Sequence, residues 1–330
     1  MNVIVSEALT REKLIDDCVS KVHEEIKNIL SDYKSSQNLC DIIKDALTSS
    51  GKMLRTKLLI SISLMGDGEI SKKVISQAAA VEITHLASLI HDDIIDDSTL
   101  RRSHKSTQAK YGKDVAVFAG DYMIAKVFSY LANENLYDES KVIADTIKHM
   151  CNGEVGQNLI KYRLDMGEEE YFENISGKTA SFFKTVCYFG ARNAGFGQMD
   201  TERMVAFGEN LGLMFQLKDD LLDLFSNKLI TGKEEFSDIR EGIYTYPVLL
   251  GLKDEDYGEE IHRILLENKE RKLGEDELIS LRKLLIKSKA DTLTALKIRD
   301  LADENRFILA SIDGKDVMYL EKILEKVENS

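Results

Sequence analysis

The strongest constraint on the fold is the scarcity of proline, since only Pro247 occurs among 330 residues. Proline breaks a helix interior, whereas sheet-rich chains need frequent turn residues, and glycine numbers only 20. No stretch shows sustained strand alternation. A spacing of three or four residues instead traces one helical face: Val74, Ala78, Val81, His85, Ser88, Asp92 and Asp96. We expect an all-α chain with about ten or more helices in a single domain, residues 1–330.

The charge balance limits the classes of partner. Lys and Arg number 44 against 57 Asp and Glu, which gives a net charge of −13 and disfavours nucleic acid. Any phosphate-bearing ligand must therefore be bound by a few local cations or by metal ions.

The sequence also indicates a location. The N-terminal residues lack a basic segment followed by an apolar one, and no run of 18 apolar residues predicts a transmembrane segment. The four cysteines form no C-x-x-C pair, so we expect reduced, buried thiols in a cytoplasmic protein. They are Cys18, Cys40, Cys151 and Cys187.

Two segments, residues 92–96 and 219–223, carry the sequence D-D-x-x-D. On a helix, residues four apart are neighbours, so Asp92 stacks on Asp96, and Asp219 on Asp223. Repelling carboxylates among Leu and Ile are costly unless a cation compensates, and carboxylate ligands suit Mg²⁺. One such motif is usually a solvated face, but two predict a metal-bound diphosphate between two facing helices.

Cations suited to phosphate accompany both clusters. Arginine binds phosphate oxygens through its planar, two-pronged guanidinium, and lysine binds them as a point charge. Near the start of a helix, free backbone N–H groups also favour anions. His85 lies on the same helical face as Asp92, seven residues earlier. The candidate cations are Lys52, Arg55, Arg101, Arg102, Lys178 and Lys233.

Together these motifs resemble the trans-isoprenyl (polyprenyl) diphosphate synthase family of medium or long chain type. The resemblance covers about residues 51–247, and the helices expected over about 253–330 carry no identifiable chemistry. Besides the two aspartate motifs, the matching elements are Ser50-Gly51-Lys52-Met53-Leu54-Arg55 for G-G-K-x-x-R, Lys178-Thr179 for K-T, and Gly120-Asp121 for G-D.

The resemblance implies an isoprenoid synthase fold, a bundle of helices around a central cavity, in a homodimer. It implies a Mg²⁺-assisted transferase, with about three ions per active site, that condenses isopentenyl diphosphate with an allylic diphosphate. Asp92, Asp96 and Asp219 are implied as direct metal ligands. Further implied ligands, or acceptors around the ions, are Asp93, Asp220 and Asp223.

The resemblance also assigns the substrate-binding residues. Arg101, Lys178 and Lys233 are expected to hold the leaving diphosphate, with Thr179 and Gln216 beside the second cluster. The residues expected to hold isopentenyl diphosphate are Lys52, Arg55, His85 and Arg102.

Several positions depart from the family pattern. Ile243 stands where a lysine often contacts diphosphate, and Ser50, Met53, Thr56 and Ser103 replace other motif residues. Because every aspartate remains, we expect weaker binding or an altered rate rather than loss of activity.

Small residues before the first motif bear on product length. In the family, bulky aromatic residues there stop growth early, but this chain has Thr84, Ala87 and Ser88. We expect an all-trans product longer than fifteen carbons, with a deeper floor at Phe128 or Tyr130.

Other readings stay open. The chain could be a non-catalytic or partner-dependent subunit, although no aspartate is missing. A class I terpene cyclase usually keeps one D-D-x-x-D and needs no second diphosphate pocket. A di-metal carboxylate bundle would need paired E-x-x-H motifs, which we do not find.

Overall fold

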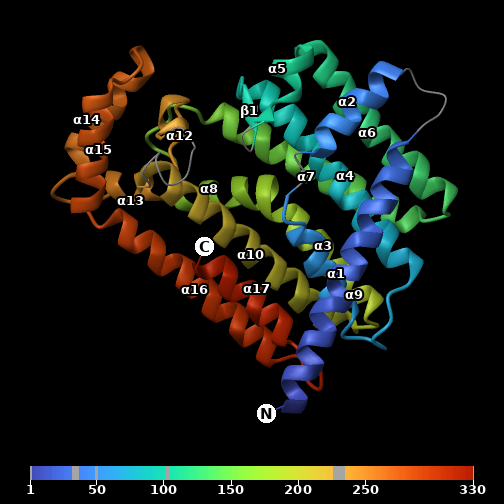
Figure 1. Ribbon diagram of the computed structural model, residues 1–330. Coiled ribbons are helices and arrows are strands. Elements are labelled where there is room, and N and C mark those ends of the chain that lie inside the picture. Colours follow the sequence, from blue (N-terminus) through green and yellow to red (C-terminus); the bar gives the residue numbers. More distant parts are fainter. Residues whose placement is uncertain (1, 32–36, 49–50, 102–103, 226–234, 330) are drawn as a thin grey trace. The chain divides into compact units, whose positions relative to one another are not determined.

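The computed structural model describes residues 2–31, 37–48, 51–101, 104–225 and 235–329, and it is overwhelmingly helical, as predicted (Figure 1). Within these residues the sheet is a short antiparallel hairpin that pairs Arg101 with His104. The elements in chain order are α1 (Asn2–Leu30), α2 (Gln37–Thr48), α3 (Leu54–Ser63), α4 (Lys72–Ile95), β1 (Leu100–Arg101), β2 (His104–Lys105), α5 (Thr107–Tyr111), α6 (Lys113–Asn133), α7 (Tyr137–Leu159), α8 (Glu168–Ile175), the π-helical turn η1 (Ser176–Ala180), α9 (Ser181–Asn193), α10 (Gln198–Phe225), α12 (Ser237–Arg240), α13 (Tyr246–Leu252), α14 (Gly258–Glu270), α15 (Glu275–Lys287), α16 (Ala290–Ala310) and α17 (Met318–Asn329).

The chain divides into two compact units. Unit 1 comprises Met1–Ile147 and Thr185–Val205, and unit 2 comprises Lys148–Lys184 and Ala206–Ser330. The helices α7, α9 and α10 each contribute residues to both units. A single domain over residues 1–330 stays a prediction.

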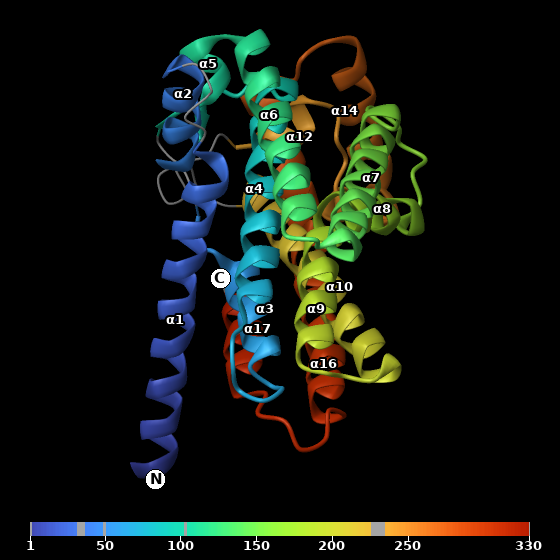
Figure 2. The ribbon, with the colours of Figure 1, turned by 90° about the vertical axis from the view of Figure 1, so that its right-hand side faces the viewer.

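Helix α4 is the centre of unit 1, where it packs against α1, α3 and most extensively α6 (Figure 2). The approach of α6 depends on Gly120, because a Cβ there would lie 2.3 Å from Nε2 of His91 on α4. This is the glycine of the G-D element. Its immediate role is therefore to let two helices pass closely.

The face of α4 predicted from the sequence runs from the core to the surface. Val74, Val81 and Ser88 are buried, whereas Asp92 is half-buried and Asp96, the helix C-cap, is exposed. One helix thus anchors itself through its apolar residues and presents carboxylates at its end.

Helix α6 also meets the length and composition of a membrane span, and it is the one such helix among the described residues. This is weak support for a span, because core helices of soluble proteins pass the same test. Its buried residues, which include Met123 and Val127, lie on the side that packs in unit 1.

The C-terminal helices build the core of unit 2 (Figure 1). Pro247 lies in the first turn of α13, where a missing backbone N–H costs nothing. Leu224, at the end of α10, belongs to the same core as Phe236, so the C-terminal third fixes the end of the helix that carries the second aspartate motif. The buried core residues are Leu224, Phe236, Ile239, Tyr244, Val248, Ile261, Leu265, Leu273, Leu278, Leu281, Leu284, Leu285 and Ala290.

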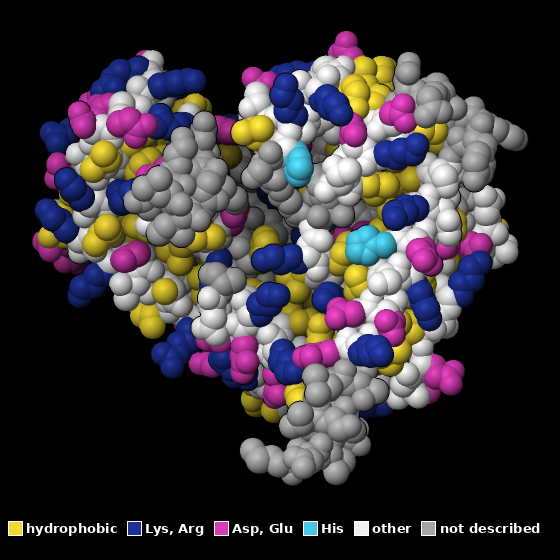
Figure 3. Space-filling view, viewed as in Figure 1, with side chains coloured by type: hydrophobic (Ala, Val, Ile, Leu, Met, Phe, Trp, Pro, Cys, Tyr) yellow, Lys and Arg dark blue, Asp and Glu magenta, His cyan; other side chains and the backbone are white. Residues whose placement is uncertain are grey.

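The surface and the thiols complete the description. Acidic and basic side chains are interspersed over the face shown in Figure 3, without a continuous basic patch on that face. All four cysteines are free, and Cys18 and Cys187 are buried as predicted. The expectation of burial is wrong for Cys151, which is exposed, and Cys40 is half-buried.

Candidate active site

The first aspartate cluster occupies the last turn of α4 in unit 1. The backbone N–H of Asp96 donates to the carbonyl of Asp92 at 2.9 Å, so these two residues keep the i, i+4 register expected of a metal-binding pair. Asp97 follows with a left-handed φ of 50° and pairs with Lys113 at 2.8 Å. The helix therefore ends at the last residue of the motif, its C-cap Asp96.

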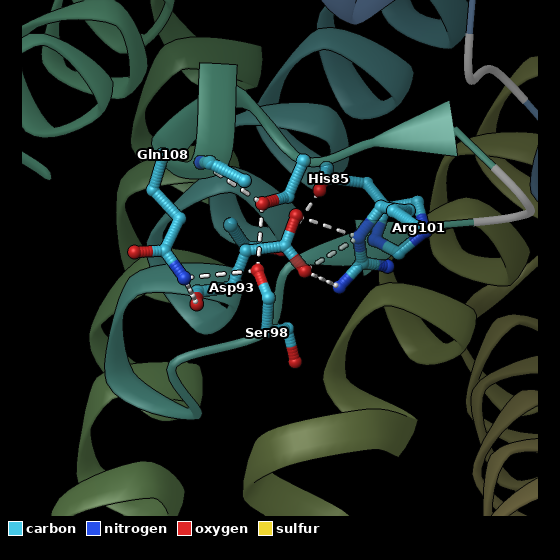
Figure 4. A network of polar contacts seen from close by, with 8 residues as sticks. His85, Asp93, Ser98, Arg101 and Gln108 are labelled. Atoms are coloured by element: carbon cyan, nitrogen blue, oxygen red, sulfur yellow. Dashed lines mark hydrogen bonds and ion pairs between the residues drawn. The ribbon is translucent and has the colours of Figure 1, made fainter. Parts of the chain in front are cut away.

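Asp93, on the other side of the same turn, is buried and bound by Arg101 from β1 (Figure 4). Nε of Arg101 donates to both carboxylate oxygens at 2.9 Å, and its terminal nitrogen lies 2.8 Å from Oδ1. Gln108 donates to the backbone carbonyls of Asp93 and Ser98, both at 2.9 Å. These contacts tie the hairpin after the motif to the helix that carries it.

The predicted cations of unit 1 occupy different settings. Lys52 is exposed and lies two residues before the first residue of α3. Arg55 donates to Nε2 of His85 at 3.0 Å, so the ring accepts there and its proton lies on Nδ1. Two residues expected to bind one diphosphate are thus already neighbours. Arg102 lies outside the described residues, as do Ser50 and Ser103.

The second aspartate cluster lies near the end of α10 in unit 2 and gathers a fourth carboxylate. Asp220 is 1% exposed, with Oδ1 accepting from Gln216 at 3.0 Å and Oδ2 accepting from Tyr171. Oδ1 of Asp223 accepts from the backbone N–H and the hydroxyl of Ser237, both at 2.9 Å. Asp238 on α12 donates its backbone N–H to the other oxygen of Asp223 at 3.4 Å.

Burial beside other carboxylates raises the pKa values of Asp220, Asp223 and Asp238. Burial raises the pKa of Asp220 to about 7, with the charges of Asp219 and Asp223 adding to the effect. Burial likewise raises the pKa of Asp223, and burial together with the charges of Asp223, Asp220 and Asp219 raises the pKa of Asp238 well above its usual range. Lys178 lowers the pKa of Asp238. Burial and mutual repulsion thus disfavour the charged forms of these three carboxylates.

The lysine and threonine of the K-T element lie in the π-helical turn η1. A Cβ on Gly153 of α7 would lie 2.5 Å from the backbone nitrogen of Lys178, and one on Gly212 of α10 would lie 2.5 Å from Cα of Ala180. Glycines on α7 and α10 thus allow these two helices to pack closely against the backbone of η1. π-Helical turns inside helices are frequent at functional sites.

Side chains of η1 contact residues of α7 and α10. Lys178 pairs with Glu154 of α7 at 2.9 Å, and Thr179 donates to Oε1 of Gln216 at 2.7 Å. Because Gln216 in turn donates to Asp220, a line of hydrogen bonds joins the turn to the second cluster. Lys233 lies outside the described residues.

Thr84, Ala87 and Ser88 are all buried in α4. The hydroxyl of Thr84 donates to the carbonyl of Ala80 at 2.8 Å, and that of Ser88 to the carbonyl of His85 at 2.8 Å. Their proposed effect on product length stays a prediction.

Sequence reasoning missed two residues at the second cluster. Asp238 follows Ser237 in a short polar segment that contains other acidic residues and lacks helical periodicity, so its sequence context gave no signal. Tyr171 gave none, because an aromatic residue on an amphipathic helix indicates only core packing.

The donor chemistry fits a hard divalent ion. Among the described residues, no group of three or more histidine, cysteine or acidic side chains is arranged so that it could hold a metal ion. A bound Mg²⁺ would nevertheless neutralise the mutual repulsion of carboxylates such as Asp220 and Asp223, whose pKa values are raised. Mg²⁺ also readily completes its coordination shell with water and phosphate oxygens.

Comparison with known proteins agrees with this chemistry. Residues 36–280 match the polyprenyl synthetase family. The chain is 33% identical to "Heptaprenyl diphosphate synthase component 2" of Geobacillus stearothermophilus over 73% of this chain and 74% of that protein. It is 34% identical to "Geranylgeranyl diphosphate synthase" of Saccharolobus solfataricus over 88% of this chain and 89% of that protein.

The fold also matches solved structures. A polyprenyl synthase from Caulobacter crescentus CB15, complexed with calcium and isoprenyl diphosphate, superimposes with a TM-score of 0.87 at 28% identity, over 96% of each chain. The helical fold, the motifs and the relatives therefore place this chain in the polyprenyl synthetase family.

Proposed function

We propose that the protein is a prenyltransferase of isoprenoid biosynthesis that lengthens an allylic diphosphate with isopentenyl diphosphate. The observation that carries the proposal is the second aspartate cluster, where carboxylates with raised pKa gather beside Lys178. The relatives support it, because they are named as synthases of prenyl diphosphates.

Mg²⁺ is the ion we assign to the clusters, with about three ions per site by family resemblance. Asp92, Asp96 and Asp219 would hold the ions, which supply neutralisation of diphosphate charge when bound. The structure neighbour that carries calcium and isoprenyl diphosphate supports a divalent cation in this role.

The chain's own cations would then divide the substrates. Lys178 would leave Glu154 to hold the allylic diphosphate, whose negative charge grows as its C–O bond breaks. Arg55 and His85 would hold isopentenyl diphosphate, whose double bond attacks the allylic carbon. The proton lost from the new carbon skeleton would pass to the departing diphosphate, so no nucleophilic serine or cysteine is needed.

We propose a product longer than fifteen carbons. Small residues at Ala87 and Ser88 support this, and Tyr130, bonded to Ser76 three turns before Ser88 along α4, is a candidate floor. An Ala87→Phe variant should shorten the product made from geranyl and farnesyl diphosphate, and unchanged length would remove this assignment.

We also propose a cytoplasmic homodimer. The relative named as component 2 of a heptaprenyl diphosphate synthase supports a second candidate, a catalytic subunit that needs a different partner chain. Size-exclusion chromatography with activity measured across the peak distinguishes an active homodimer from a chain that is inactive alone.

The direct experiment is to incubate the purified protein with labelled isopentenyl diphosphate, Mg²⁺ and allylic primers of several lengths. We expect a longer prenyl diphosphate that requires the metal ion. Absence of any product from every primer, with and without candidate partner subunits, would overturn the proposed function.

A further inference from the structure

We propose that Tyr171 is a positioning residue that holds the second aspartate cluster in its metal-binding arrangement. This inference rests on the proposed function and deepens it. Tyr171 lies on α8, outside every motif of the family resemblance, and its hydroxyl donates to Oδ2 of Asp220.

The position of the Tyr171 hydroxyl is fixed by its surroundings. The residue is 5% exposed, and its ring stacks on Tyr246 with centroids 5.8 Å apart and an interplanar angle of 26°. Phe172 meets the same ring edge-on at 5.2 Å. A buried phenol between two aromatic rings has few alternative rotamers, so its O–H is a rigid donor.

Asp220 in turn fixes the rotation of α10. Gln216 occupies its other oxygen, so donors without charge engage both oxygens of this buried carboxylate. Asp219 and Asp223 lie on the same turn of the helix, and pinning Asp220 determines where these neighbours point. Tyr171 thus acts through Asp220 rather than by touching substrate.

Two anchors hold the cluster from different elements. Ser237 of α12 engages Asp223, and Tyr171 of α8 engages Asp220. Groups that orient metal ligands through hydrogen bonds typically contribute about 10- to 100-fold to metal affinity. Loss of the Tyr171 hydroxyl should therefore weaken metal binding more than it changes the fold.

The test compares Tyr171→Phe with Tyr244→Phe. Tyr244 is a matched control because it is a buried phenol of the same unit, and its hydroxyl donates at 3.2 Å to the backbone carbonyl of Leu265. Binding of Mn²⁺ in the presence of inorganic diphosphate is measured by electron paramagnetic resonance, together with the Mg²⁺ dependence of prenyl transfer. Circular dichroism verifies that each variant is folded.

We expect Tyr171→Phe to weaken Mn²⁺ binding and to raise the half-saturating Mg²⁺ by about tenfold or more. The KM for each diphosphate at saturating Mg²⁺ should change less than about twofold, and Tyr244→Phe should leave metal binding unchanged. In an Asp220→Asn background, adding Tyr171→Phe should have no further effect on metal binding.

Equal metal affinity in Tyr171→Phe and the wild type would overturn the positioning role. So would a full additional loss in the Asp220→Asn background, since Tyr171 would then act elsewhere. Because Mn²⁺ binding is read without turnover, failure here leaves the proposed function standing. A wild type that binds Mn²⁺ and diphosphate but transfers no prenyl group would instead count against that function.

Discussion

The ion pair between Asp93 and Arg101 allows a quantitative prediction, because its partners differ in burial. The Asp93 side chain is 5% exposed and that of Arg101 is 26% exposed. Replacing Arg101 by leucine leaves a buried carboxylate without its cation, whereas Asp93→Asn leaves a guanidinium that still reaches water. The two single variants should therefore differ in stability.

Breaking a fully buried pair costs about 3–5 kcal/mol, so we expect Arg101→Leu to cost about 3 kcal/mol of unfolding free energy. Asp93→Asn should cost about 1–2 kcal/mol, because the amide oxygen still accepts from Arg101. The double variant removes the stranded charge and should be more stable than the sum of the single effects predicts, by about 2 kcal/mol.

Urea titration followed by far-UV circular dichroism measures these effects, since the chain contains no tryptophan for fluorescence. The titrations are run without metal or substrate, which separates stability from binding. Arg203→Leu is the control, because its pair with Asp200 leaves both side chains more than a third exposed and should contribute less than about 0.5 kcal/mol. Additive effects, or a larger cost for Asp93→Asn, would refute the burial argument.

Two further predictions concern the second cluster and its turn. Gly153→Ala would place a Cβ 2.5 Å from the backbone nitrogen of Lys178, so we expect it to lower the free energy of unfolding by about 1–3 kcal/mol and to abolish most of the prenyl transfer. In the control Gly167→Ala, the new Cβ would have nothing within 4 Å, so stability should change little. Equal unfolding midpoints for the two variants would contradict the close packing of Gly153 against η1. Because burial raises the pKa of Asp220 from 3.8 to about 7, folding favours its protonated form, so the stability of the metal-free protein should fall as pH rises between about 4 and 7. Asp220→Asn should flatten that slope in thermal melts, and an unchanged slope would refute this assignment.

Much of the fold and part of the site could be predicted from the sequence. The scarcity of proline and the three-to-four spacing in residues 74–96 predicted α4 and its acidic end, because helical periodicity is a local property. The paired placement of Gln216 beside Asp220 follows from the same periodicity, since they are four residues apart.

What the sequence could not reveal depends on tertiary contacts. The pairing of Asp93 with Arg101 requires the hairpin to fold back onto α4, and nothing in the spacing distinguishes a cation aimed at phosphate from one aimed at a neighbouring carboxylate. Tyr171 and Asp238 lie 49 and 18 residues from Asp220 along the chain, so only packing brings them to it. The close packing against η1 likewise needs glycines from two other helices.

The central claim is that both aspartate clusters act on the same diphosphate through divalent ions. Calorimetric titration of inorganic diphosphate in the presence of Mg²⁺ tests it directly, with the wild type, Asp92→Asn, Asp219→Asn and the double variant. We predict that each single variant binds diphosphate at least about tenfold more weakly, and that the double variant loses far less than the product of the two effects. Wild-type affinity in either single variant, or losses in the double variant that simply multiply, would contradict the claim.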